Sequence, residues 1–255
     1  MSLVVTDTPA AGIARICINR PERRNAFNPQ VREELIAAYD AAIADDKIRA
    51  IVMGSAHGVF CAGGDITGMT ESTPEAVRAR MKRNHQFVRA LIECRKPVIA
   101  AVEGFAVGAG CGLALMADSI VLGEGAVMGI PFFKLGLVPD YAILHLLPRR
   151  MGQAQARQVL LYGRNYKGKE AQDIGLCDAV APDAKVADCA IELAQELASQ
   201  PQNAFALTKM QLALYPQSLD AALEMENMAQ SLSFHTADHA EGKAAFLEKR
   251  KPKFA

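Results

Sequence analysis

The chain has 255 residues, and 51% of them are hydrophobic, which is typical of a globular protein of one large domain or of a main domain with an appendage. Its 28 Lys and Arg residues balance 28 Asp and Glu residues, so there is no global field to attract nucleic acid or an anionic membrane. We therefore expect a small-molecule partner, with neither a nucleic acid nor a membrane as partner.

The cysteine pattern argues against a disulfide framework and against a structural zinc site. The cysteines lie far apart, form no CxxC pair and have no histidine at zinc-finger spacing; they stand at positions 17, 61, 94, 111, 177 and 189. The first residues lack a basic region followed by a long apolar run, and the apolar stretch 97–122 is interrupted by charges and glycines. We expect reduced thiols, no metal and a cytoplasmic location.

In the first half of the chain, strand and helix patterns alternate. Residues 14–19 alternate like a strand, and 28–46 begin with an Asn cap and a proline before apolar residues at helical spacing. The segments that follow read as a strand (49–55), a helix (73–94), a strand (96–104), a short helix (108–118) and a strand (119–123). This order predicts an α/β domain with parallel strand pairing.

Helical patterns dominate after Gln153. They cover residues 153–163, 183–200, 202–216 and 218–250, and the composition shifts near residue 200. Before them lies the apolar segment 129–147, whose one carboxylate is Asp140. Asp is among the best N-cap residues, so "PDYAILHLL" predicts a cap at Asp140 and a two-turn helix that ends at Pro148.

Two glycine-rich turns follow predicted strands. "GVFCAGGDI" spans 58–66 and "EGFAVGAGCGLALMAD" spans 103–118. Each leads toward a helix start, where free backbone N–H groups suit an anion or a carbonyl oxygen that becomes one. The alternative is a pair of tight turns that need glycine flexibility. The spacing of Gly108, Gly110 and Gly112 is not G-x-G-x-x-G, which argues against a dinucleotide site, and the missing GK[ST] excludes a P-loop.

Several motifs occur together in a specific order. The segments "NRPERRNAFN", "FCAGGDI", "AAVEGFAVGAGCGLALMAD", "PFFKLGLVPD" and "EGKAAFLEKRKPKF" resemble the enoyl-CoA hydratase/isomerase, or crotonase, superfamily over essentially the whole chain. The resemblance implies an α/β spiral of ββα turns over residues 1–195. It also implies a C-terminal all-helical region, residues 196–255, that assembles homotrimers or hexamers.

The resemblance also implies an acyl-CoA site. The peptide N–H groups of Ala62 and Ala109 match the oxyanion hole that holds the thioester oxygen. Residues that match the substrate site are Arg24, Ala26, Ala62, Gly64, Asp65, Ile66, Phe132 and Tyr141, with Phe246 and Lys249 contributed by a neighbouring subunit. Arg24 reads equally as a solvated arginine, and the end-helix reads equally as plain packing. No cofactor is implied, because coenzyme A is part of the substrate.

The acid residues of the family's hydratases are missing. Gly112 and Phe132 occupy the two matching positions, and neither side chain can exchange a proton. Asp140 matches the acid of isomerase branches, including phenylacetate-pathway isomerases with a similar "KLGL-P-D" run, while Tyr141 replaces the glycine that commonly follows. The resemblance therefore favours an acyl-CoA isomerase in which Asp140 moves a proton. A hydratase or hydrolase that recruits another group, and a non-catalytic acyl-CoA-binding protein, remain alternatives, and a cap role for Asp140 can coexist with catalysis.

Overall fold

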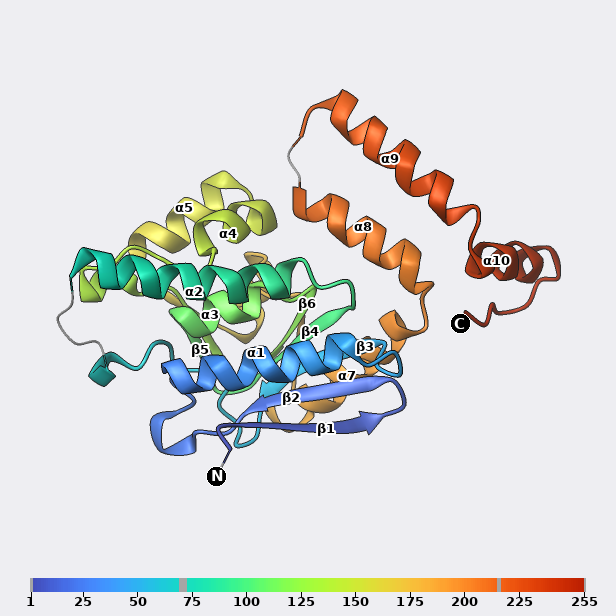
Figure 1. The fold of residues 1–255 in the computed structure, drawn as a ribbon. Helices are drawn as coiled ribbons and strands as arrows, with labels where there is room; N and C mark the ends of the chain where they lie inside the picture. Colours follow the sequence, from blue (N-terminus) through green and yellow to red (C-terminus); the bar gives the residue numbers. More distant parts are fainter. Residues whose placement is uncertain (1, 69–72, 215–216, 255) are drawn as a thin grey trace.

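Two sheets form the centre of the molecule in a computed structural model that describes residues 2–68, 73–214 and 217–254 (Figure 1). The larger sheet has the order β1-β2-β3-β4-β6-β9, and every pair is parallel except the β1–β2 hairpin. Its strands are β1 (Val4–Ala10), β2 (Ile13–Ile18), β3 (Ala50–Ser55), β4 (Val98–Val102), β6 (Ser119–Gly123) and β9 (Ala179–Ala181). The smaller sheet consists of β5 (Phe105–Val107), β7 (Val127–Gly129) and β8 (Asn165–Lys167).

The chain winds from one sheet to the other in ββα turns. The helices of the core are α1 (Pro29–Ala44), α2 (Pro74–Ile92), α3 (Ala109–Leu115), α4 (Ile143–Met151), α5 (Gln153–Tyr162), α6 (Gly168–Asp173) and α7 (Val186–Ala198). In one such turn β4 joins the larger sheet, β5 joins the smaller one, and α3 follows. The predicted α/β architecture with parallel pairing is therefore confirmed.

The inner strands of the larger sheet, β2, β3, β4 and β6, are buried on both faces, whereas β1 at the edge is mostly exposed. Ile13, Val52 and Ile99 point toward α7 and form a small core with its alanines. On the opposite face, Ile16, Ile51 and neighbouring residues join the main core, which also takes side chains from α1 to α5. Burial on both faces explains why β3 and β4 are nearly continuous apolar runs.

Three helices lie to one side of this core, as the orange and red segments of Figure 1 show. They are α8 (Gln202–Leu214), α9 (Leu219–Ser233) and α10 (Ala237–Leu247). The helix expected over 202–216 ends at Leu214 within the described residues, and positions 215–216 lie outside them. The segment 218–250, expected to be helical, is two helices separated near Thr236. The boundary at 195/196 stays a prediction; the break between α7 and α8 lies at 199–201.

One buried ion pair ties α8 to the core. The Nζ of Lys209 lies 2.6 Å from the Asp118 carboxylate, and their side chains are 10% and 23% exposed. Lys209 also donates to the Lys96 carbonyl oxygen at 3.2 Å. Across the described ranges, none of the helices is both long enough and apolar enough to span a bilayer.

Candidate active site

The two glycine-rich turns lie against each other at the edge of the smaller sheet. Cys61 forms a bridge with Ala106, because its N–H donates to the Phe105 carbonyl at 2.7 Å and its carbonyl accepts from Val107 N–H at 3.1 Å. A Cβ on Gly110 would lie only 2.2 Å from the Cys61 carbonyl oxygen, so this approach requires glycine. The contact places Ala62 and Ala109, each next to a contacting residue, in the same corner of the molecule.

The two predicted oxyanion donors differ in their present partners. Ala109 is the first residue of α3, so its N–H has no acceptor within the helix. The N–H of Ala62 donates to the Arg24 carbonyl oxygen at 3.0 Å. Arg24 has φ 49° and Asn25 has φ 57°, both in the left-handed region. A thioester oxygen at this site must therefore share the Ala62 donor with the Arg24 carbonyl or displace that carbonyl.

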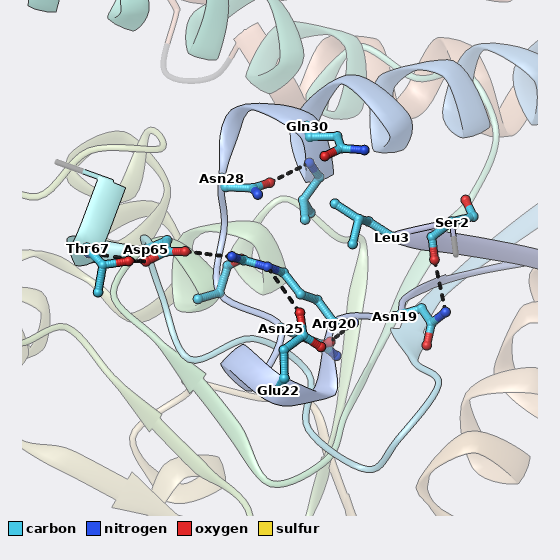
Figure 2. A network of polar contacts seen from close by, with 12 residues as sticks. Ser2, Leu3, Asn19, Arg20, Glu22, Asn25, Asn28, Gln30, Asp65 and Thr67 are labelled. Atoms are coloured by element: carbon cyan, nitrogen blue, oxygen red, sulfur yellow. Dashed lines mark hydrogen bonds and ion pairs between the residues drawn. The ribbon is translucent and has the colours of Figure 1, made fainter. Parts of the chain in front are cut away.

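A polar network holds the loop that carries Arg24 (Figure 2). The side-chain amide of buried Asn25 donates to the Ile18 and Val59 carbonyls and accepts from Arg20 N–H at 2.7 Å. Arg20 in turn lies 2.7 Å from the Asp65 carboxylate. Hydrogen bonds from Thr67 and then Arg20 lower the pKa of Asp65 to about 2. Arg20 and Asn25 were not among the predicted site residues, although a charged residue and an amide inside a turn were the available signal.

The residues expected to contact coenzyme A fall into two groups. Those of the first group lie on two adjacent loops; they are Arg24, Ala26, Ala62, Gly64, Asp65 and Ile66. Two hydrogen bonds of 2.8 Å join these loops: Phe27 N–H donates to the Gly63 carbonyl, and Asp65 N–H donates to the Phe27 carbonyl. Arg24 and Ile66 are exposed, whereas the other four are partly buried. The second group, Phe246 and Lys249, lies at the exposed end of α10, with Phe246 84% exposed. One chain alone does not bring this pair to the loops (Figure 1), so their contribution from a neighbouring subunit stays a prediction.

Asp140 does not cap a helix. The helix α4 begins at Ile143 after Ala142, which is left-handed and makes no side-chain cap bond, and α4 continues through Pro148 to Met151. The prediction of an Asp140 cap and of an end at Pro148 was therefore wrong. Two consecutive left-handed residues, Tyr141 and Ala142, delay the helix start by two positions.

One oxygen of the Asp140 carboxyl, Oδ1, is instead buried and has no hydrogen-bond partner among the described residues. Burial raises the pKa of Asp140 to about 6, against the opposing effects of its own backbone N–H and of the positive charges of Arg80, His85 and Arg32. Such a group is half ionised at about pH 6 and can exist in either form close to neutral pH, which suits a residue that both accepts and returns a proton.

Aromatic side chains fill the two positions where the hydratase acids were expected. A Cβ on Gly112 would lie 2.6 Å from the Tyr141 Cβ, so a glutamate there has no room. Phe132 is buried, and its ring would lie 3.8 Å from a Cβ on Gly108, beside the start of α3. Tyr141 is buried as well, and its ring centroid lies 5.6 Å from that of Phe27. These contacts place Phe132 and Tyr141 around the first turn of α3, near Ala109.

Two other kinds of chemistry find no support in the described part of the chain. Burial raises the pKa of the Cys61 and Cys111 thiols to about 12, which keeps both protonated and poorly nucleophilic. No group of three or more His, Cys, Asp or Glu side chains with the geometry of a metal site occurs among the residues described.

The arrangement defines an α/β spiral protein with a helix-start N–H donor at the junction of two glycine turns. The loop that contacts α3 through Tyr141 carries the Asp140 carboxyl, one oxygen of which is buried and unpartnered among the described residues. The sequence profile of the family described as Enoyl-CoA hydratase/isomerase matches residues 8–255. The chain belongs to this family.

Curated relatives cover nearly the whole chain. The 1,2-epoxyphenylacetyl-CoA isomerase of Escherichia coli (strain K12) is 36% identical over 248 residues, which are 95% of each chain. A putative enoyl-CoA hydratase/isomerase of Bacillus subtilis (strain 168) is 37% identical over 245 residues, with 95% of each chain covered. The 2,3-dehydroadipyl-CoA hydratase of Escherichia coli is 34% identical over 240 residues, covering 94% of this chain and 93% of the relative. Isomerase and hydratase names thus both occur among the relatives.

Solved structures agree with the fold. The enoyl-CoA hydratase/isomerase of Cupriavidus metallidurans CH34 superposes with a TM-score of 0.94 at 29% identity, covering 100% of this chain and 96% of the other. An enoyl-CoA hydratase of Polaromonas sp. JS666 gives a TM-score of 0.93 at 30% identity, covering 99% of both chains. The fold is therefore the crotonase fold that the resemblance implied.

Proposed function

We propose that this member of the family is an acyl-CoA isomerase that shifts a carbon–carbon double bond along the acyl chain. The Asp140 carboxylate removes the proton from the carbon between the thioester and a 3,4 double bond. The electron pair moves onto the thioester oxygen, and the same carboxyl returns the proton at the far end of the former double bond. The product is the conjugated 2-enoyl thioester, so one acid/base group is sufficient.

Backbone donors stabilise the charge that develops in this reaction. The thioester oxygen binds the N–H of Ala109 and that of Ala62, once the latter is shared with or released by Arg24. Each such donor contributes about 3 kcal/mol when it is aligned with the developing oxyanion. The small side chains at both positions leave room for the thioester, and no cofactor takes part because coenzyme A belongs to the substrate.

The observation that carries the proposal is Oδ1 of Asp140, which is buried and unpartnered among the described residues, next to Tyr141, which contacts Gly112 of α3. Both hydratase-type acids are absent, and the space for one of them is occupied by Tyr141. Addition of water through a pair of glutamates therefore has no counterpart here. The likeness to an isomerase named for a phenylacetyl-CoA epoxide is consistent with this interpretation.

The test is conversion of 3-hexenoyl-CoA to 2-hexenoyl-CoA, followed by the ultraviolet absorbance of the conjugated thioester. We expect turnover by the wild type and its loss in Asp140→Asn, with acyl-CoA still raising the melting temperature of the variant. The matched control is Asp40→Asn, which changes an exposed carboxylate on α1. Unchanged turnover in Asp140→Asn refutes the role of Asp140.

Two other outcomes identify the alternatives. Hydration of crotonyl-CoA at an appreciable rate indicates a hydratase, a name that several relatives carry. Thermal stabilisation by acyl-CoA thioesters without any turnover indicates a binding protein, for which the occupied Ala62 N–H would be the structural reason.

We also infer a homo-oligomer, trimer or hexamer, from the apolar surface of the C-terminal helices. A groove of about 420 Å³ lies between α8 and α9 and includes Leu207, Leu212 and Ala229. Exposed apolar side chains continue along these helices and include Met210, Leu219, Leu223, Met228, Leu232 and Phe234. An apolar surface of this extent is typical of a face that binds another copy. Sedimentation analysis of the purified chain tests this inference.

A further inference from the structure

Besides Asp140, three polar side chains are buried among the described residues without complete hydrogen bonding: Tyr39, whose hydroxyl has no partner, Arg32 and Asn84. Arg32 on α1 is 7% exposed, and Asn84 on α2 is 4% exposed. The Arg32 Nε–H donor and the Asn84 Oδ1 acceptor have no hydrogen-bond partner among the described residues. Leaving a buried polar group unpaired costs about 1–3 kcal/mol. Packing alone therefore favours apolar residues at both positions.

Arg32 lies beside the candidate active site. Its positive charge acts on both Tyr141 and Asp140. Arg32 lies on the buried face of α1, together with Leu35 and Tyr39. A charged residue at a position where the helical pattern expects an apolar one was the sequence signal.

Asn84 approaches the same region from α2. Arg80, one turn earlier on the same helix face, acts electrostatically on Asp140. Phe87, one turn later, has its ring 6.4 Å from Phe27, which in turn contacts Tyr141. The unpaired donor and the unpaired acceptor thus belong to two helices whose neighbouring residues act on, or pack next to, the loop that contains Asp140.

The free atoms specify the chemistry of the group that would satisfy them. A hydroxyl accepts a hydrogen bond from Arg32 Nε–H and donates one to Asn84 Oδ1. A carboxylate has no proton to donate to Asn84, and it would be repelled by the ionised form of Asp140. A plain hydrocarbon satisfies neither atom.

We propose that Arg32 and Asn84 bind a hydroxyl group on the acyl chain, so that the site selects hydroxylated acyl-CoA thioesters over hydrocarbon ones. This inference deepens the proposed function and rests on its acyl-CoA site. It assigns both residues to substrate specificity rather than to the proton transfer.

The experiment measures binding of saturated thioesters, which cannot be isomerised, to the full chain by titration calorimetry. The pairs are 4-hydroxybutanoyl-CoA with butanoyl-CoA and 6-hydroxyhexanoyl-CoA with hexanoyl-CoA. In at least one pair we expect the hydroxylated ligand to bind wild type tenfold or more tightly, because a site with unpaired polar groups rejects the analogue that lacks the partner. The ratio should fall to about one in Arg32→Met and in Asn84→Leu.

Two controls make the result specific. Arg83→Met removes an exposed arginine from α2 and should keep the full preference. Asn84→Leu should keep or raise the melting temperature, because the unpaired acceptor is gone, while it loses the preference.

Equal affinities within both pairs in wild type, or a preference that survives in both variants, overturn the proposal and indicate that a buried water satisfies the two atoms. Because the readout is binding, a hydroxyl preference without any isomerisation leaves this inference standing and refutes only the proposed reaction.

Discussion

Replacing Asp140 by asparagine should stabilise the protein above pH 6 even as it removes activity. Burial raises the pKa of Asp140 from 3.8 to about 6, a shift of about two units. One unit corresponds to about 1.4 kcal/mol, so the ionised carboxylate lowers the free energy of unfolding by about 3 kcal/mol. A raised pKa in the folded state means that the favourable protonated form dominates at low pH. Its contribution is lost as the pH rises through 6.

The assay is urea unfolding of wild type and Asp140→Asn from pH 5 to pH 8, with Asp40→Asn as the exposed-carboxylate control. We expect the variant to be more stable by about 3 kcal/mol at pH 8 and by about half of that at pH 5. The control should show no such trend. In parallel, kcat/KM of wild type for 3-hexenoyl-CoA should rise with pH through about 6, because the base must be deprotonated. A stability difference that does not change with pH refutes the desolvation of Asp140.

Three further changes have expected outcomes. Gly112→Glu should not produce crotonyl-CoA hydration. It should lower the free energy of unfolding by about 1–3 kcal/mol, because the Cβ of residue 112 would lie 2.6 Å from the Cβ of Tyr141. Adding Tyr141→Gly should restore the stability, measured by urea titration. Asn25→Ala should lower the free energy of unfolding by about 2–4 kcal/mol and raise KM for acyl-CoA, because a buried amide with bonds to two loops is lost; unchanged KM contradicts this. Lys209→Met should cost about 1–2 kcal/mol and loosen α8, measurable as faster hydrogen exchange there, since Asp118 loses its buried partner.

The fold followed from the sequence wherever an element was long enough to show a period. The pattern over 28–46 predicted α1 with its Asn28 cap, whose side chain accepts from Val31 N–H as expected. The pattern over 49–55 predicted β3 within one residue. The strands β5, β7 and β8 have three residues each, too few to show alternation, so the second sheet was not predicted; the family resemblance implied only a spiral of ββα turns.

The polar parts of the site were less accessible from the sequence. The small residues at 62 and 109 were recognisable because a substrate can approach backbone N–H donors closely only where side chains are small. The two turns also need glycine at 110, where a Cβ would lie 2.2 Å from the Cys61 carbonyl oxygen. The bond from Ala62 N–H to the Arg24 carbonyl accompanies two left-handed residues; Asn25 is only a weak marker of that conformation, and Arg24 is none. The unpaired atoms of Arg32 and Asn84 arise from contacts between separate helices, so no local pattern marks them as incomplete.

Two departures from the family pattern that looked independent in the sequence are one structural exchange. The residue at 112 lacks a side chain, and the residue after the acid at 140 is a tyrosine rather than a glycine. In the structure the Tyr141 Cβ occupies the space that a Cβ at 112 would need. A glutamate at 112 therefore requires a smaller residue at 141, and a tyrosine at 141 requires glycine at 112. The same tyrosine is left-handed, which delays α4 and leaves Asp140 without the cap bonds that would keep its pKa low. One exchange of side chains thus accounts both for the glycine at 112 and for the uncapped Asp140 on which the proposed isomerase activity rests.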